Sequence, residues 1–273
     1  MTQFRRIASV LALATVSAVS LPGCIIGDCE DGQDNCISLE SGTTYTDTDT
    51  QSVAYTAGQG LVIDGFNGRI EIEDGAAADQ IEVEWKKSVV AETSDAGEDQ
   101  AKARFDSDIQ VNVTSDTNVR IETDRDSSNG NPTVTLLVRL PASFDGAISI
   151  EQGNGTVDLD LRSFTPSAVT VRNDGAGDVD ITGAQGTLDI QGGFDVAVQM
   201  SAWPTGDSQL LSDGQLGDVE VTLPADANGT ISVTGETVEL PAGLTDDGSG
   251  NITVGDGMGA ALTVTGPRLV TLL

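Results

Sequence analysis

Carboxylates are the residues most able to do chemistry in this chain, because acids far outnumber bases and histidine is absent. The sequence holds 43 Asp and Glu against 13 Lys and Arg, with no histidine and a net charge of −30. Without histidine there is no Ser-His-Asp or Cys-His catalytic site and no histidine-ligated zinc. The charge also excludes nucleic acid as an expected partner, since binding phosphates requires basic residues.

Two groups of acids have spacings that suit Ca²⁺, a cation that prefers carboxylate and carbonyl oxygens on turns. One group surrounds the second cysteine of the chain, and the other lies in glycine-rich breaks near the C-terminus. Neither matches an EF-hand loop, and a solvated acidic surface is the favoured interpretation of both. Ca²⁺ is the one cofactor that the sequence suggests. The candidate ligands are Asp28, Glu30, Asp31, Asp34, Asp246, Asp247 and Asp256.

Catalysis by paired carboxylates is the alternative chemistry. A glycosidase needs two of them across a cleft, one with a raised pKa, whereas the acids here mostly alternate with apolar residues, as on a solvated strand face. Lyases built on β-helices combine Ca²⁺-binding acids with an Arg or Lys base, but residues 173–267 contain no basic residue. We therefore predict that the chain is not an enzyme, with a Ca²⁺-dependent carbohydrate-active enzyme as the alternative. The remote candidates for its base are Arg120, Arg139, Arg162 and Arg172.

Cys24 is the cysteine whose surroundings indicate a modification. Arg5 and Arg6 precede an uncharged, mostly apolar stretch that ends at Leu21-Pro22-Gly23-Cys24. A basic start, an apolar stretch of about 7–15 residues and a small residue before the cut define an export signal. The cysteine at the cut resembles the lipobox, in which the thiol receives a diacylglyceryl group. We predict a signal peptide over 1–23 and a membrane anchor at Cys24; a plain secretory signal is the alternative.

The residues after Cys24 predict a short linker to the body. No Asp comes directly after Cys24, which favours sorting to the outer membrane over the inner one. Cys29 and Cys36 remain, and in an oxidising compartment such a pair most simply forms a disulfide; free thiols or pairing between chains are the alternatives. Residues 37–52 are rich in Thr, Ser and Asp and predict a solvated tether. Anchor and tether therefore span 24–52, and the body spans 53–273.

The body has the pattern of an all-β domain. Apolar and polar residues alternate strictly, as in Val157-Asp158-Leu159-Asp160-Leu161, and glycine-rich breaks separate these stretches. From Ile148 onward strand starts recur about every ten residues, a spacing typical of repeats, sandwiches or barrels. We predict a repetitive β-solenoid with one short helix near 96–105; the alternative is an antiparallel β-sandwich. The side chains expected inside are Val157, Leu159, Val179, Ile181, Leu188 and Ile190.

Three features together resemble a known family. These are the opening Leu61-Val62-Ile63 followed by Gly68-Arg69-Ile70-Glu71-Ile72, the acidic insert before Ile109, and strand ends with Leu-Pro followed by Gly-x-Ile/Val units. They resemble the DUF4097-type β-strand-repeat proteins, labelled "putative adhesin", over about residues 55–270. The resemblance implies a β-solenoid at the cell envelope and supplies no catalytic residue. We expect a non-enzymatic envelope lipoprotein for adhesion, scaffolding or sensing, whose partner is an unidentified envelope protein or polysaccharide.

Overall fold

The chain divides into two compact units, residues 1–41 and 42–273. The computed structural model describes residues 25–26, 36–37, 42–92, 103, 105, 107–125, 132–214 and 216–273. In the first unit β1 (Ile25–Ile26) pairs in parallel with β2 (Cys36–Ile37). Among the described residues, no helix is long and apolar enough to cross a membrane.

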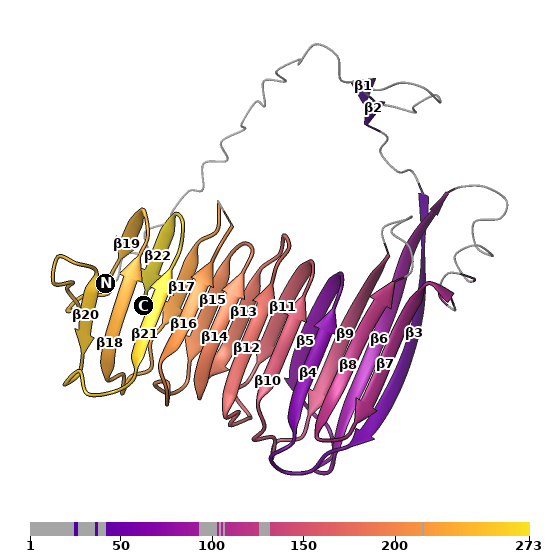
Figure 1. Ribbon diagram of the computed structural model, residues 1–273, viewed down its shortest axis with the longest axis horizontal. Coiled ribbons are helices and arrows are strands. Elements are labelled where there is room, and N and C mark those ends of the chain that lie inside the picture. Colours follow the sequence, from indigo (N-terminus) through magenta and orange to yellow (C-terminus); the bar gives the residue numbers. More distant parts are fainter. Residues whose placement is uncertain are drawn as a thin grey trace, which may run out of the picture. The chain divides into compact units, whose positions relative to one another are not determined.

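The second unit consists of two ten-stranded sheets (Figure 1). The β10 sheet contains, in spatial order, β20 (Asn251–Val254), β18 (Gly229–Thr234), β21 (Ala261–Thr265), β16 (Ser208–Ser212), β14 (Thr187–Gly192), β12 (Ala168–Asn173), β10 (Ile148–Gln152), β4 (Gly60–Gly65), β8 (Asn118–Arg125) and β7 (Ile109–Ser115). The β11 sheet contains β19 (Thr237–Glu239), β22 (Leu269–Leu272), β17 (Val219–Thr222), β15 (Val196–Met200), β13 (Val179–Ala184), β11 (Gly155–Asp160), β5 (Gly68–Asp74), β9 (Thr133–Leu140), β6 (Gln80–Glu92) and β3 (Gly42–Ala54).

Consecutive strands alternate between the two sheets through the middle of the chain. β10 pairs in parallel with β12, and β12 with β14, while β11 pairs in parallel with β13, and β13 with β15. Antiparallel pairs occur only near the ends of the sheets, at β3·β6, β6·β9, β7·β8 and β18·β20, within the second unit. We call two consecutive strands in the middle, one in each sheet, a layer, for example β10 with β11. Each layer stacks on its neighbour through the parallel pairs of both sheets.

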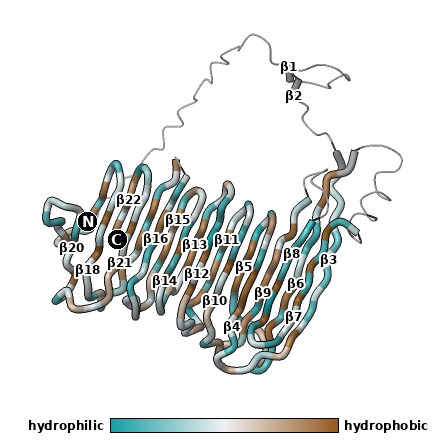
Figure 2. Tube along the Cα trace, in the orientation of Figure 1, coloured by the Kyte–Doolittle hydropathy of each residue, from teal (hydrophilic) through white to brown (hydrophobic). Residues whose placement is uncertain are grey.

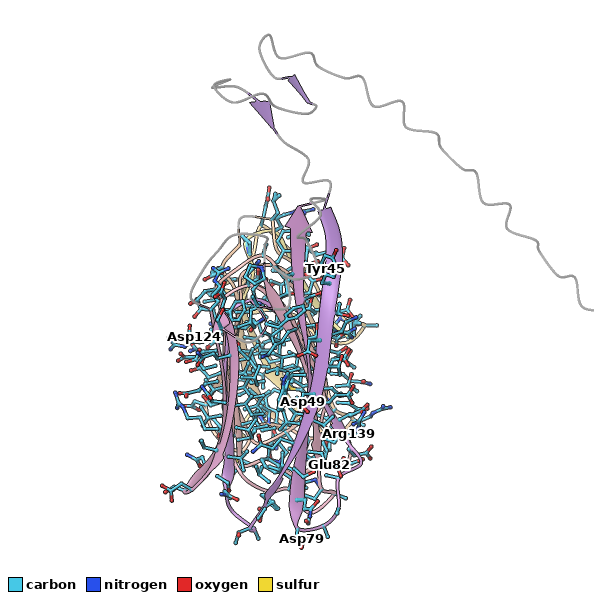
Figure 3. The ribbon with its side chains drawn as sticks, turned by 90° about the vertical axis from the view of Figure 1, so that its right-hand side faces the viewer. Tyr45, Asp49, Asp79, Glu82, Asp124 and Arg139 are labelled. Carbon is cyan, nitrogen blue, oxygen red and sulfur yellow. The ribbon has the colours of Figure 1, made fainter. Side chains whose placement is uncertain are left out.

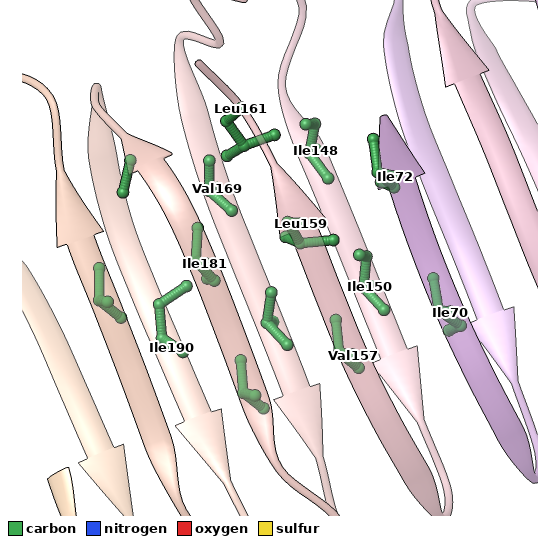
Figure 4. Packing of buried hydrophobic residues seen from close by; sticks show 14 of the residues in the cluster. Ile70, Ile72, Ile148, Ile150, Val157, Leu159, Leu161, Val169, Ile181 and Ile190 are labelled. Atoms are coloured by element: carbon green, nitrogen blue, oxygen red, sulfur yellow. The ribbon is translucent and has the colours of Figure 1, made fainter. Parts of the chain in front are cut away.

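The core lies between the sheets because side chains alternate across each strand. Ile150 lies in register with Ile63 and Val171, so the apolar stripe of one strand continues into the next. The six side chains that the sequence places inside are all between 0% and 1% exposed, which confirms that prediction. Figure 2 shows the alternation along the strands, and Figure 4 shows the resulting rows of aliphatic side chains.

The recurring Leu-Pro motif closes one end of the layers. In Leu140-Pro141-Ala142-Ser143-Phe144, the amide of Phe144 donates to the carbonyl of Pro141 at 2.9 Å, and a turn of the same form without a proline joins Phe164 to Leu161 at 3.0 Å. The fourth residue of each turn is thereby directed into the core. Phe144 and Phe164 are 0% and 1% exposed, and their rings meet edge to face at 6.4 Å. The motif is thus a plug between the sheets.

Two strand pairs lie out of chain order. β4 and β5 lie between β8/β9 and β10/β11, and the C-terminal strands β21 and β22 lie between β16/β17 and β18/β19. Val270 and Leu272 are 0% and 1% exposed, and the amide of Leu273 donates to the carbonyl of Val221 at 2.8 Å. The last residues of the chain are therefore an internal layer and not a frayed end.

The structure corrects the extent of the predicted tether. Residues 42–54 form β3, which pairs antiparallel with β6 along its whole length, so the body begins at Gly42 and not at Val53. Threonine favours strands, and Asp47 lies opposite Lys87. Asp47 and Asp49 alternate along β3 on the same face as Tyr45, and both aspartates are exposed; Figure 3 shows where Tyr45 and Asp49 lie along the strand. Charges on an edge strand oppose pairing with another chain, and a strand rich in Thr and Asp resembles a solvated segment in the sequence.

The all-β prediction is confirmed. Most of the helix predicted at 96–105 lies outside the described residues, although Ala103, Phe105 and Ser107 are helical. The two large mixed sheets face each other, and this arrangement also fits the sandwich alternative. The parallel pairs in the middle, however, do not fit a sandwich of antiparallel sheets.

Replacing Leu272 by alanine tests whether the C-terminal layer supports the whole unit. Because Leu272 is buried between two layers, we expect Leu272→Ala to lower the free energy of unfolding by about 2–5 kcal/mol. The matched control Thr271→Ala, on the outward face of the same strand, should change it by less than about 0.5 kcal/mol. Urea unfolding of the full chain measures both. An effect of Leu272→Ala as small as that of Thr271→Ala would show that β22 is not part of the cooperative unit.

Candidate functional site

A polar pocket of about 620 Å³ lies where strands of the β10 sheet turn toward the β11 sheet. We call the turns at this edge the turn row: residues 66–67, 153–154, 174–178, 193–195 and 213–218, of which residue 215 lies outside the described part. The pocket occupies its first three turns together with the end of β8. The side chains that line it are the carboxylates Asp64, Glu151 and Asp174, the amides Asn67, Gln152 and Asn154, and Phe66 and Arg125.

Buried polar side chains hold the turn row in place. Gln152 and Asn173 are in register at the inward ends of β10 and β12, and they are 3% and 0% exposed. Gln152 Nε2 donates to the carbonyls of Gly68 (3.0 Å) and Asn154 (2.8 Å). Asn173 Nδ2 donates likewise to Gly155 (2.7 Å) and Gly177 (3.0 Å). These bonds tie the ends of β10 and β12 to the carbonyls where β5, β11 and β13 begin, and the carbonyl of Asn154 also accepts the amide of Gly68 at 3.0 Å.

The same two amides leave buried acceptors without a partner. Gln152 Oε1 and Asn173 Oδ1 are enclosed and accept no hydrogen bond within the described residues. Buried polar atoms in native proteins are nearly always bonded. Gln152 is a lining residue of the pocket, but its Oε1 is enclosed and is not exposed on the pocket surface.

The carboxylates of the pocket come from neighbouring strands. Asp64 and Glu151 are in-register partners on β4 and β10, and both side chains are exposed. Partners on adjacent strands lie about 4.8 Å apart, so two negative charges stand side by side. Glu122 continues this row on β8 next to Asp64, and Arg120 bonds it at 2.5 Å. The hydrogen bond with Glu122, and then the charges of Glu122, Asp64 and Glu151, raise the pKa of Arg120.

The opposite part of the pocket carries amides and a guanidinium. Asn154 Nδ2 donates to Asn67 Oδ1 at 3.2 Å, and Asn67 Nδ2 donates to the carbonyl of Pro132 at 3.1 Å. The guanidinium carbon of Arg125 lies 5.2 Å from the centre of the Phe66 ring, within cation–π distance. The pocket therefore offers both donors and acceptors, and neighbouring groups orient Asn67, Asn154 and Arg125.

The predicted Ca²⁺ ligands are not brought together where they are described. Asp246 accepts the amide of Gly248 and Asp247 accepts that of Ser249, while Asp256 accepts that of Met258. These amide bonds lower the pKa of Asp247 and of Asp256. No group of three or more metal-ligating side chains occurs in the described part of the chain. Asp28, Glu30, Asp31 and Asp34, together with Cys24 and Cys29, lie outside it, and Cys36 is described only as part of β2.

Three of the four remote candidates for a catalytic base, Arg120, Arg139 and Arg162, are held in ion pairs. Hydrogen bonds to Asp160 raise the pKa of Arg162, as Glu122 raises that of Arg120, so both guanidinium groups stay protonated. Arg139 contacts Glu73 at 3.0 Å and Glu84 at 3.4 Å on the outer face of the β11 sheet. Arg172 lies in register with Glu151. None of these four arginines lines the pocket; the arginine that does is Arg125.

Trp203 is a packing residue. Its Nε1 donates to the carbonyl of Ala260 at 3.1 Å, and its side chain packs against the core. A Cβ on Gly229 would lie 2.7 Å from Trp203 Nε1, so the glycine leaves room for the indole. The side chain joins the layer of β18 to the turn before β21.

A row of acids crosses the outer face of the β11 sheet, away from the pocket. Asp158 is in register with Glu71 and Asp180. Arg69 bonds Glu71 at 2.7 Å and Asp158 at 2.8 Å. The pKa of Asp180 is raised, first by partial loss of hydration and then by the charges of Asp158 and Glu220. This side of the row therefore contains uncompensated repulsion.

Comparisons with solved structures show similarity at low sequence identity. A "putative cell adhesion protein" from Clostridium sporogenes is 14% identical with a TM-score of 0.49, over 84% of this chain and 99% of that chain. A "putative adhesin" from Bacteroides fragilis is 12% identical with a TM-score of 0.35, over 83% and 97%. No protein-family profile and no curated protein matches the sequence. These similarities transfer no residue, so the function is argued from this chain alone.

No residue of the pocket was predicted from the sequence as a site residue. Gln152 and Asn173 carried a usable signal, because they are polar at positions where the alternation calls for an apolar side chain. Asp64 and Glu151 carried none, because they resemble the other outward acids until their strands are placed side by side.

The Asp180 row makes a prediction about pH. A raised pKa means that the folded state binds this proton more tightly than the unfolded state, so unfolding becomes easier as pH rises above the ordinary value of 3.8. We expect Asp180→Asn to stabilise the protein at pH 7 by up to about 1 kcal/mol. The gain should shrink toward pH 4 and in high salt, since the side chain is exposed.

The control is Asp189→Asn, which removes a carboxylate from the outer face of the other sheet. Asp189 Oδ1 accepts a hydrogen bond from Gln209 Nε2 at 2.7 Å, so its replacement should bring no gain. Melting temperatures of the full chain at pH 4 and pH 7 measure both variants. An equal gain from both at pH 7 would show that total charge, and not this row, is responsible.

Proposed function

We propose that this protein is a non-enzymatic module of the cell envelope that serves adhesion, scaffolding or sensing. The observation that carries the proposal is the turn row. Polar side chains stand in fixed orientations on a rigid stack of strands, an arrangement suited to binding. The adhesion proteins to which the structure is similar lend no independent weight, because the identities are too low.

We also propose that the body is a β-solenoid and not two separately wound sheets. The support is connectivity: consecutive strands enter opposite sheets, and each pairs in parallel with the strand two further along. Layers built in this way present one turn each to the same edge, which produces a row of turns. The mixed pairing near the ends then closes the coil.

The lipid anchor is part of the proposal. The basic start, the apolar stretch and Leu21-Pro22-Gly23-Cys24 support export and acylation at Cys24. The absence of Asp after Cys24 supports the outer membrane as the destination. Such an anchor would hold the acidic body close to the surface, with the proposed disulfide of Cys29 and Cys36 between the two.

Mass spectrometry of the N-terminal peptide tests the anchor. We expect residues 1–23 to be removed and Cys24 to carry lipid, with the protein in the outer-membrane fraction. The control Cys24→Ser should leave the protein unacylated and released from membranes. A native protein that is soluble with an unmodified Cys24 would contradict the proposal.

Cell retention tests the adhesive function. Cells that produce the full chain should be retained on a surface coated with their own envelope polysaccharide more than cells that produce Cys24→Ser. Equal retention would contradict adhesion to that polysaccharide. The enzymatic alternative gains support from three carboxylates and Arg125 in one pocket. Release of sugar products from polysaccharides, abolished by Asp64→Asn, would establish that alternative.

A further inference from the structure

We propose that the pocket in the turn row binds a neutral saccharide through its hydroxyl groups, an inference that rests on the adhesive function proposed above. The site is the cavity of about 620 Å³ formed by the turns after β4, β10 and β12 and by the end of β8. Ligand pockets of this size combine a few oriented polar groups with an apolar surface. Here the apolar surface is Phe66.

The carboxylates select a ligand that donates hydrogen bonds. Asp64 and Glu151 stand on adjacent strands, and an ionised carboxylate only accepts. Bonds from hydroxyl groups to a carboxylate are stronger than bonds between neutral groups. A ligand with several adjacent hydroxyls could reach both side chains at once.

The other side of the pocket requires a ligand that also accepts. Arg125 presents only donors, and its guanidinium carbon lies 5.2 Å from the centre of the Phe66 ring. Asn154 is held by Asn67, which is itself held by Pro132. Fixed side chains lose little conformational freedom on binding. Hydroxyl groups both donate and accept, so a polyol matches the two sides.

Charge argues against the competing ligands. Three carboxylates face one guanidinium in the lining, and the whole chain carries −30, so an acidic sugar or a phosphate is repelled. The described residues contain no cluster of three or more metal-ligating side chains, so a bound cation is not the expected occupant either. A neutral saccharide meets neither obstacle.

The test is a printed array of neutral, amino-bearing and acidic oligosaccharides, probed with the full lipidated chain in detergent. We expect binding to neutral saccharides, weakened at least about tenfold in Asp64→Asn, which loses a charge-assisted acceptor. The matched control is Asp213→Asn, at an exposed acid of the same turn row that bonds Gln191 outside the pocket. It should bind as the parent does, and neither variant should melt at a lower temperature than the parent.

Each other outcome overturns part of the proposal. Binding to acidic or amino-bearing saccharides alone, or equal loss in both variants, would rule out a neutral ligand in this pocket. Cells that are retained although no saccharide binds would leave the adhesive function standing and remove the saccharide. Saccharide binding without retention would support the pocket and remove adhesion. Neither binding nor retention would contradict both.

Discussion

The close spacing of stacked layers is the constraint on which the rest of the structure depends. Neighbouring strands lie about 4.8 Å apart in both sheets, so each layer must match the outline of the next. Inside, aliphatic side chains meet aliphatic side chains, as Leu159 meets Ile72 and Ile181. Where β5 and β11 begin, beside the turn row, the room for side chains is smaller still, since a Cβ on Gly155 would lie 1.7 Å from the carbonyl oxygen of Gly68. Gly155 has a φ of 122°, which also favours glycine.

This constraint explains why the pocket has mixed chemistry on a regular scaffold. The inward amides of Gln152 and Asn173 fasten the glycine-rich turns to the first residues of the strands that follow them. The outward side chains beside those turns are then free to vary. Asp64, Arg125 and Asn154 can differ in charge and shape without disturbing the aliphatic rows beneath them. The outward polar side chains of the pocket and the inward aliphatic side chains of the core thus occupy different faces of the same strands.

Periodicity revealed the composition of each layer but not the order of the layers. Val157 and Leu159 could be placed inside because alternation within one strand decides it. The position of β3 could not, since Thr and Asp alternate there without an apolar stripe, and its strand character depends on β6. The pocket was equally hidden, because Asp64 and Glu151 become neighbours only when strands distant in the chain pair in register. Local patterns contain no information about such pairing.

The internal position of β21 and β22 affects how the molecule comes into being. A chain emerging from the ribosome or a membrane channel presents its N-terminal residues first, yet β18 and β19 rest on strands that are made after them. Layers β10 to β17 can assemble in the order of synthesis, but the layer of β18 and β19 has to wait for Leu269–Leu272. A product that stops before β21 would therefore lack the surface on which β18 and β19 pack.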